Sequence, residues 1–163
     1  MCIRDRDIWE NNFHSFNNRI LLSYSWPLRS FPNYAQQLEM ESLGKPANPK
    51  SIFKKTSQTI FGGFGPKAQH SYFQQLHQGT ENYSVDLFSN REDRVDEKLI
   101  SKQLQAQLTL FKNCPRELKG SQEEVKANVN FNHFELAKID PFHLGYLIAC
   151  LLYTSPSPRD LST

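Results

Sequence analysis

Short apolar runs alternate along this chain with longer segments in which apolar residues recur at helical spacing. Parallel strands joined by helical crossovers produce this order. The sequence therefore predicts an α/β fold in which a mainly parallel sheet is flanked by helices. The expected strands lie at 19–24, 58–61, 83–88 and 129–139, and the expected helices at 27–43, 68–78, 95–111 and from 141 onward.

Proline and glycine mark the expected boundaries of these elements. We expect Pro27 to lie in the first turn of the first helix, Pro32 to bend that helix and Gly44 to end it. The glycine-rich stretch 62–66 is expected to form a loop between the second strand and the second helix. Asp140, followed by a proline, is expected to cap the last helix.

The two ends of the chain share one DNA element. The string ATG TGT ATA AGA GAC AG can encode Met1 to Arg6, and its reverse complement contains TGT CTC TTA TAC ACA, which encodes Cys150 to Thr154. A sequencing adapter on both sides of an insert would produce this relationship. The alternative is coincidence plus a genuine proline-rich tail. We expect residues 1–6 and 150–163 to be translated adapter, and 7–149 to come from within a longer gene.

Charge and cysteine content exclude some classes of function. Without the expected adapter residues, the formal net charge falls from +2 to +1, and no basic run remains. This balance gives no electrostatic footprint for nucleic acid or for a membrane surface. Cys114 is the one cysteine left in 7–149, so no internal disulfide is possible, and a reducing cytoplasm fits best.

The end of the first predicted helix carries an amide and a carboxylate on one face. Gln37 and Glu41 are four residues apart, whereas Glu39 and Glu41 are two apart and do not share a face. The negative end of the helix dipole disfavours carboxylate charge near Glu41, which suits a general base. The alternative is a solvated face near a helix end.

The second predicted helix carries His70, Phe73 and His77 on one stripe. Two histidines could ligate a metal, but no cysteine or carboxylate completes the set, so no metal site is expected. His70 would lie at the helix N-terminus, where backbone amides face an anionic or hydroxylated ligand. The other histidines have no companions and are interpreted as structural; they are His14, His133 and His143.

Four segments resemble one enzyme family. The first two resemble the pattern Q-x-x-M-E-S-x-G-K followed by a Gly-rich loop and Q-H-x-F/Y-x-x-x-H-Q-G-T, and the last resembles K-x-x-P-F-x-L-G-x-L-I/V-A. In this order and spacing they look like the C-terminal half of the glucose-6-phosphate isomerase family. The segments are FPNYAQQLEMESLGK (31–45), FGGFGPKAQHSYFQQLHQGT (61–80), VDLF (85–88) and FELAKIDPFHLGYLIA (134–149).

The resemblance implies a partial three-layer sugar-isomerase (SIS-type) domain, truncated at both ends. It implies a homodimer that interconverts glucose 6-phosphate and fructose 6-phosphate through a cis-enediol, in glycolysis and gluconeogenesis, without metal or organic cofactor. Glu41 matches the family's base, Gln37 a residue that contacts the sugar phosphate, and His70 the histidine that helps open the sugar ring in the partner's active site. The family's phosphate loop lies upstream of 7–149 and its catalytic lysine downstream, so the chain alone is expected to be inactive.

The chain departs from the family pattern in two places. The common loop reads G-x-P-G-T-N-G-Q-H, whereas Pro66, Lys67 and Ala68 stand here for Thr, Asn and Gly, and Leu43 stands where Asn is usual. The residues leave open two alternatives to a metal-independent isomerase. One is a non-catalytic sugar-phosphate-binding regulator of the same fold, and the other is a metal-dependent isomerase that uses His70 and His77.

Overall fold

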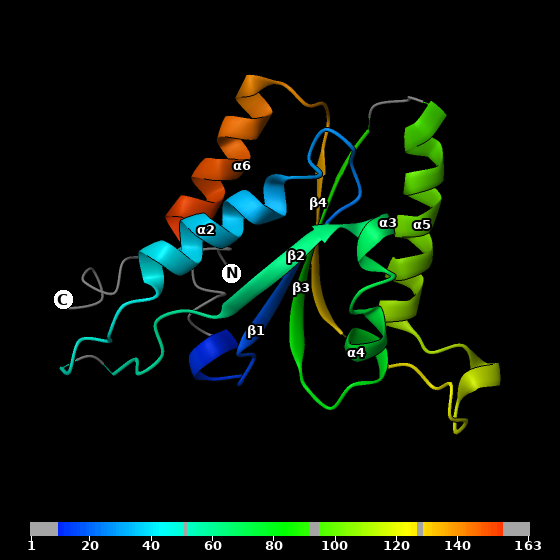
Figure 1. Cartoon of the computed structure of the whole chain (residues 1–163), viewed down its shortest axis with the longest axis horizontal. Coiled ribbons are helices and arrows are strands. Elements are labelled where there is room, and N and C mark those ends of the chain that lie inside the picture. The colour runs from blue at the N-terminus through cyan, green and yellow to red at the C-terminus, as the bar shows by residue number, and fades with distance from the viewer. Residues whose placement is uncertain (1–9, 51, 92–94, 127–128, 155–163) are drawn as a thin grey trace.

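A single parallel sheet forms the centre of the molecule. The computed structural model describes residues 10–50, 52–91, 95–126 and 129–154 (Figure 1). All neighbouring strands pair in parallel, in the order β2-β1-β3-β4. This confirms the expected α/β class. The strands are β1 (Asn18–Ser23), β2 (Thr59–Phe64), β3 (Tyr83–Asn90) and β4 (Asn130–Leu136).

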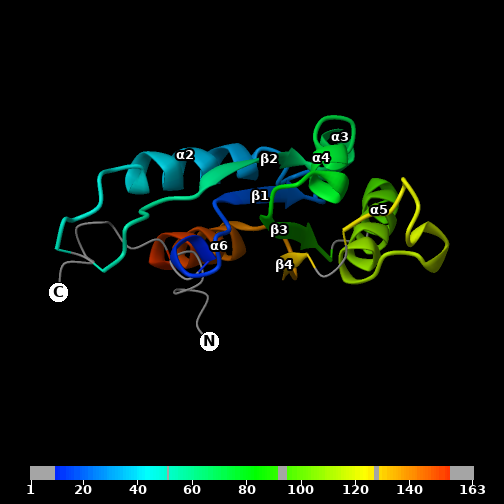
Figure 2. The same cartoon turned by 90° about the horizontal axis from the view of Figure 1, so that it is seen from below.

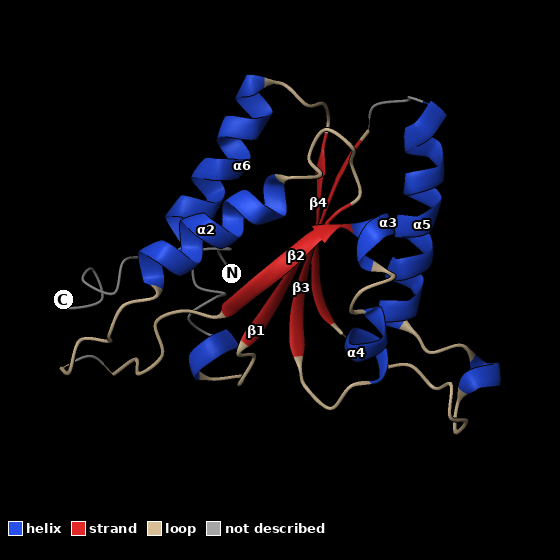
Figure 3. Ribbon diagram, in the orientation of Figure 1, coloured by secondary structure: helices blue, strands red, loops and turns tan. Residues whose placement is uncertain are grey.

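Helices cover both faces of this sheet and make three layers. Helices α2 and α6 lie on one face, and α3, α4 and α5 lie on the other (Figure 2). Figure 3 shows the strands fanning out between these two groups of helices. The helices are α2 (Phe31–Leu43), α3 (Gly65–Ala68), α4 (Phe73–Gln78), α5 (Val95–Lys112) and α6 (Pro141–Thr154), with a 3-10 turn, η2, at Arg116–Leu118.

Alternate residues of the central strands pack into two separate hydrophobic cores, one on each face of the sheet. Leu22 and Leu87 point to the face of α3, α4 and α5, where they pack with Leu104 and other apolar side chains. Leu21 and Phe88 point to the opposite face and pack beneath α2 and α6. Burial on both faces explains why these strands read as continuous apolar runs in the sequence.

The first helix begins later than expected. Residues 27–30 form a turn, and α2 starts at Phe31 with Pro32 in its first turn. A proline there removes an N–H that has no partner within the helix, so it does not bend the helix. The expectations that Pro27 opens this helix and that Pro32 bends it were both wrong.

The glycine-rich stretch is partly strand. Gly62 and Gly63 belong to β2, contrary to the expected loop. Gly62 is required by close packing, because a Cβ atom there would lie 1.9 Å from the carbonyl oxygen of Leu21 on β1. Glycine therefore permits the close approach of the two strands at this point.

The second predicted helix is two short helices. Residues 69–72 form a turn between α3 and α4, and Tyr72 takes φ −135° and ψ 9°, outside helical values. The Tyr72 ring packs edge-on against Phe61 of β2, with 5.2 Å between ring centroids. This contact holds the turn against the sheet where the sequence predicted a continuous helix.

The last helix begins as predicted. The backbone N–H of His143 donates to Asp140 Oδ1 at 2.8 Å, which confirms Asp140 as the N-cap of α6. Among the described residues, no helix has the length and apolar character that a membrane crossing requires.

Candidate functional site

The exposed face of α2 carries the predicted amide and carboxylate pair. Gln37 Nε2 donates to Glu41 Oε2 at 3.4 Å, and both side chains are exposed. The helix ends just beyond them, where the N–H of Gly44 donates to the carbonyl of Met40 at 2.9 Å. This confirms that Gln37 and Glu41 share a face, that Glu41 lies in the last turn, and that Gly44 ends the helix.

His70 lies in the turn between α3 and α4. Its N–H donates to the carbonyl of Lys67 at 3.2 Å, and its side chain is exposed. The expectation that His70 lies at a helix N-terminus was wrong, because α4 starts three residues later at Phe73. The turn still presents the imidazole to solvent, where it can meet a ligand.

Glu41 and His70 lie on opposite sides of the sheet. Helix α2, which carries Glu41, packs on the same face of the sheet as α6. The turn that carries His70 joins α3 and α4, which pack on the other face (Figure 1). The structure therefore brings Gln37 and Glu41 together, and it separates both of them from His70 within one chain.

His77 is a core histidine. Its Nε2 lies 3.0 Å from Gln107 Nε2, and its ring lies 5.7 Å from the rings of both Phe73 and Phe111. Burial lowers its pKa, which favours the neutral imidazole as acceptor of the Gln107 amide. The predicted stripe of His70 and His77 does not form. No group of three potential metal ligands occurs in the part of the chain that the structure describes.

Sequence reasoning missed a buried cluster of charged side chains. Arg19 of β1 donates from Nε to Asp86 Oδ2 at 2.8 Å, and from Nη1 to Glu39 Oε2 at 3.0 Å. Asn132 of β4 donates to Asp86 Oδ1 at 2.9 Å. An arginine that begins an apolar strand run was the available signal, because a buried guanidinium needs a carboxylate partner.

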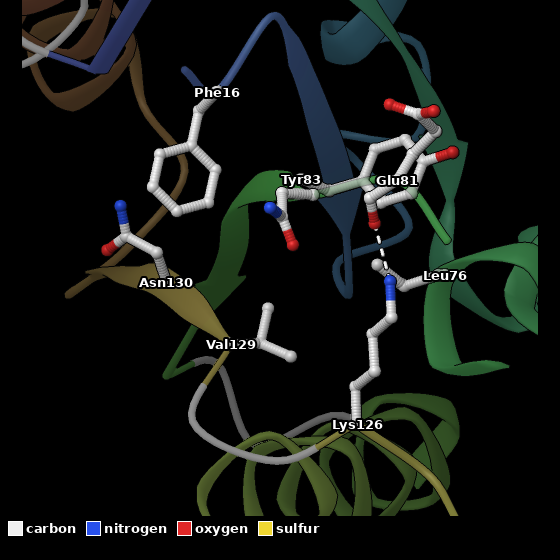
Figure 4. Close-up of a pocket in the computed structure, with 8 residues that line it drawn as sticks. Phe16, Leu76, Glu81, Tyr83, Lys126, Val129 and Asn130 are labelled. Carbon is white, nitrogen blue, oxygen red and sulfur yellow. Dashed lines mark hydrogen bonds between the residues drawn. The ribbon is translucent and has the colours of Figure 1, made fainter. Parts of the chain in front are cut away.

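Among the described residues, cavities lie at the two ends of the strands of the sheet. One, of about 410 Å³, lies at the carboxyl end of β2 and is lined by Trp26, Arg29, Gly63 and Lys67 among others. The other, of about 340 Å³, lies at the amino ends of β3 and β4, where Lys126 Nζ donates to the Glu81 carbonyl at 2.5 Å (Figure 4). Gln37, Glu41 and His70 line neither of these cavities.

Comparisons with known proteins show which family this chain resembles. The family model for phosphoglucose isomerase matches residues 4–151. A glucose-6-phosphate isomerase of Legionella pneumophila (strain Lens) is 34% identical over 144 residues, which cover 87% of this chain and 28% of the relative. Another, of Borreliella burgdorferi (strain ZS7), is 40% identical over 96 residues, covering 58% and 18%. The chain thus spans under a third of the length of these relatives.

Solved structures share the fold. The crystal structure of a glucose-6-phosphate isomerase from Chlamydia trachomatis matches with a TM-score of 0.74 and 26% identity, over 90% of this chain and 31% of that one. A hypothetical protein from Thermus thermophilus matches with a TM-score of 0.62 and 19% identity, over 91% and 36%, and shows the fold alone. These matches confirm the resemblance carried by the four motif segments. The chain belongs to the phosphoglucose isomerase family.

Proposed function

We propose that this chain is part of a glucose-6-phosphate isomerase that acts in glycolysis and gluconeogenesis. Its substrates are then sugar phosphates, and it uses neither a metal ion nor an organic cofactor. The observation that carries the proposal is the Gln37 and Glu41 pair, exposed together in the last turns of α2, in a chain of this family. An aldose–ketose isomerase needs one positioned carboxylate beside the sugar carbonyl, and Glu41 supplies it.

Glu41 acts as the base of the reaction. Its carboxylate removes the proton from C2 of the open-chain aldose, which leaves the cis-enediol in its singly ionised form, and the hydroxyl proton on O2 moves to O1. Glu41 then returns the proton to C1 and so forms the ketose, with no net gain or loss of protons. Gln37 donates to Oε2 of Glu41 and restricts the direction of the carboxylate, and its amide contacts the sugar phosphate.

His70 acts in the active site of a second copy of the chain. Helix α2 and the α3–α4 turn pack against opposite faces of the sheet, which makes it hard for one chain to bring Glu41 and His70 to the same sugar. A homodimer solves this problem if the α3–α4 turn of one subunit reaches the α2 end of its partner. His70 then helps open the sugar ring before Glu41 acts. We place this dimer in the cytoplasm, with no nucleic-acid or membrane partner.

We also propose that residues 7–149 are the natural segment and that the flanking residues are translated adapter. The segment supplies Gln37, Glu41 and His70 but neither the family's phosphate loop nor its catalytic lysine. We therefore expect the 163-residue chain by itself to be inactive.

Recovering the flanking coding sequence from the source DNA tests these proposals together. The natural sequence should diverge from this chain just before Asp7 and just after Ala149, and should encode a downstream segment like F-D-Q-W-G-V-E-x-x-K. The longer protein should convert fructose 6-phosphate to glucose 6-phosphate in the presence of a chelator. A longer protein that binds sugar phosphate without converting it would instead be a regulator. Activity lost with the chelator would favour the metal-dependent alternative.

A further inference from the structure

The charged cluster beneath α2 is almost completely withdrawn from water. The side chains of Arg19, Glu39 and Asp86 are 3%, 2% and 0% exposed, respectively. They come from β1, α2 and β3, and Asp86 lies 67 residues from Arg19 in the sequence. Charged groups at this depth persist only when they are paired and hydrogen-bonded, so the geometry of this cluster is tightly defined.

Arg19 is the centre of the cluster. Its Nε and Nη2 both donate to Asp86 Oδ2, and its Nη1 donates to Glu39 Oε2 at 3.0 Å. Asn132 holds the other oxygen of Asp86 at 2.9 Å. The planar guanidinium fork therefore has one edge fixed on the sheet and presents the remaining nitrogen to α2 in a set direction.

Glu39 is the polar contact in the buried stripe of α2. That stripe comprises Phe31, Ala35, Glu39 and Leu43, which recur every four residues, together with Pro32. Successive residues of an α-helix are rotated by about 100°, so Glu39 points about 200° away from both of its second neighbours. Those neighbours are Gln37 and Glu41, the exposed pair on the opposite side of the helix.

Stability alone does not require charged groups at this place. Replacing a buried ion pair by apolar residues of similar volume is often neutral or stabilising, because desolvation offsets the Coulombic attraction. Apolar contacts also let a helix roll about its axis, whereas a hydrogen-bonded carboxylate permits one orientation. A second polar contact, from Gln36 Nε2 to the carbonyl of Ile60 at 2.6 Å, ties the same helix to β2.

We infer that Arg19 is a positioning residue for the isomerisation. Through Glu39 it fixes the rotation of α2 about its own axis, and thereby the direction in which Gln37 and Glu41 face the sugar. This inference rests on the proposed function, because it assigns Arg19 and Glu39 a role in a reaction that Glu41 carries out. Neither residue touches the substrate.

The test compares variants of the longer isomerase that contains this segment. Glu39→Leu removes both acceptor oxygens while Arg19 keeps Asp86, so the protein should remain folded. A misdirected base slows proton transfer without weakening substrate binding. We expect kcat per folded active site to fall about 10-fold or more, and KM for fructose 6-phosphate to change less than about 3-fold. The primary isotope effect with glucose 6-phosphate deuterated at C2 should rise, a change that loss of folded protein cannot produce.

A triple variant and a control separate positioning from stability. Arg19→Met, Glu39→Leu and Asp86→Leu together should keep the melting temperature or raise it, yet lower kcat at least as much as Glu39→Leu alone. The control, Glu135→Gln, breaks the exposed ion pair with Arg91 and should leave kcat unchanged.

Two results would overturn the inference. Either kcat within about 2-fold of wild type in both Glu39→Leu and the triple variant, or an unchanged isotope effect, would show that Arg19 does not position the base. An inactive wild-type protein would refute the proposed function itself, and the inference with it.

Discussion

Gln37 and Glu41 meet across one turn of α2, with Gln37 Nε2 lying 3.4 Å from Glu41 Oε2 in the last two turns before Gly44. Both side chains are exposed, so a ligand can reach the carboxylate directly. The amide occupies one oxygen of Glu41 and leaves the other available to take a proton. This arrangement gives the two residues different roles, which substitutions can separate.

Replacing the base should remove catalysis and leave binding. In the longer isomerase we expect Glu41→Gln to lower kcat by about 100-fold or more, because the amide cannot accept the C2 proton. The shape of the side chain is kept, so KM for fructose 6-phosphate should change little. Steady-state rates in both directions would measure this effect.

A matched control distinguishes the base from an ordinary surface carboxylate. Glu117→Gln makes the same chemical change in the exposed turn η2, and it should leave the rates at wild-type values. Near-normal turnover by Glu41→Gln would exclude Glu41 as the base and favour the solvated helix face.

Mixing two inactive variants should restore activity if each active site uses two subunits. Glu41→Gln subunits lack the base, and His70→Ala subunits lack the ring-opening imidazole. A mixed dimer holds one site with both substitutions and one site with neither. One of its two active sites should therefore work. Unfolding and refolding a mixture, followed by an activity assay, would measure the recovery.

The same mixture can contradict the shared site. If Glu41 and His70 served the same site from one subunit, every site in a mixed dimer would lack one of them, and mixing would recover nothing. His70→Ala alone should slow reaction of the ring-closed sugar more than that of an open-chain analogue. Equal losses on both would assign His70 a structural role.

Local patterns predicted the sheet well and the chain's polar contacts poorly. The apolar runs located all four strands because burial on both faces requires continuous apolar sequence. The sequence predicts a loop at Gly62 and Gly63 because glycine usually marks turns, whereas the contact of Gly62 with Leu21 lies between two strands. That contact depends on strand pairing, which a local window of sequence does not contain.

The same reason explains what was missed at the candidate site. The i, i+4 spacing of Gln37 and Glu41 is a local property of one helix, and it was predicted correctly. The partners of Arg19 come from β3 and α2, so no local pattern joins them. The position of His70 in a turn could not be predicted locally either. It depends on the contact between Tyr72 and Phe61, which interrupts the helical conformation before α4 begins.

Adjacent glycines in β2 should respond oppositely to alanine. A Cβ at Gly62 would lie 1.9 Å from the Leu21 carbonyl oxygen, so the two strands must separate. We expect Gly62→Ala to lower the free energy of unfolding by about 1–3 kcal/mol. Gly63→Ala meets no atom within 4 Å and should change it by less than about 1 kcal/mol. Urea unfolding of the two variants would measure the difference, and equal effects would refute the close strand contact.

One buried histidine, His77, and one half-buried histidine, His133, make the folded chain sensitive to mild acid. Burial lowers the pKa of His77 and that of His133, so both stay neutral in the folded chain when they would already be protonated in the unfolded chain. Asp140 affects the stability of the fold in a different, more acidic pH range. Its pKa is lowered by hydrogen bonds from the backbone and side chain of His143, so its contribution to stability is lost only below the ordinary carboxyl pKa of 3.8.

The last prediction follows from the sign of this linkage at His77. Below its ordinary pKa of 6.5, the unfolded state binds a proton that the buried imidazole does not, so the free energy of unfolding falls as the pH decreases from 7.5 to 5.5. His77→Gln keeps an acceptor for the Gln107 amide but cannot titrate, so its loss of stability over this range should be smaller, with His133 supplying the remainder. The control His14→Gln changes an exposed side chain and should lose as much stability as wild type. Urea unfolding at pH 7.5, 6.5 and 5.5 would measure all three proteins. Identical pH dependence in His77→Gln and wild type would show that His77 is not buried as a neutral imidazole.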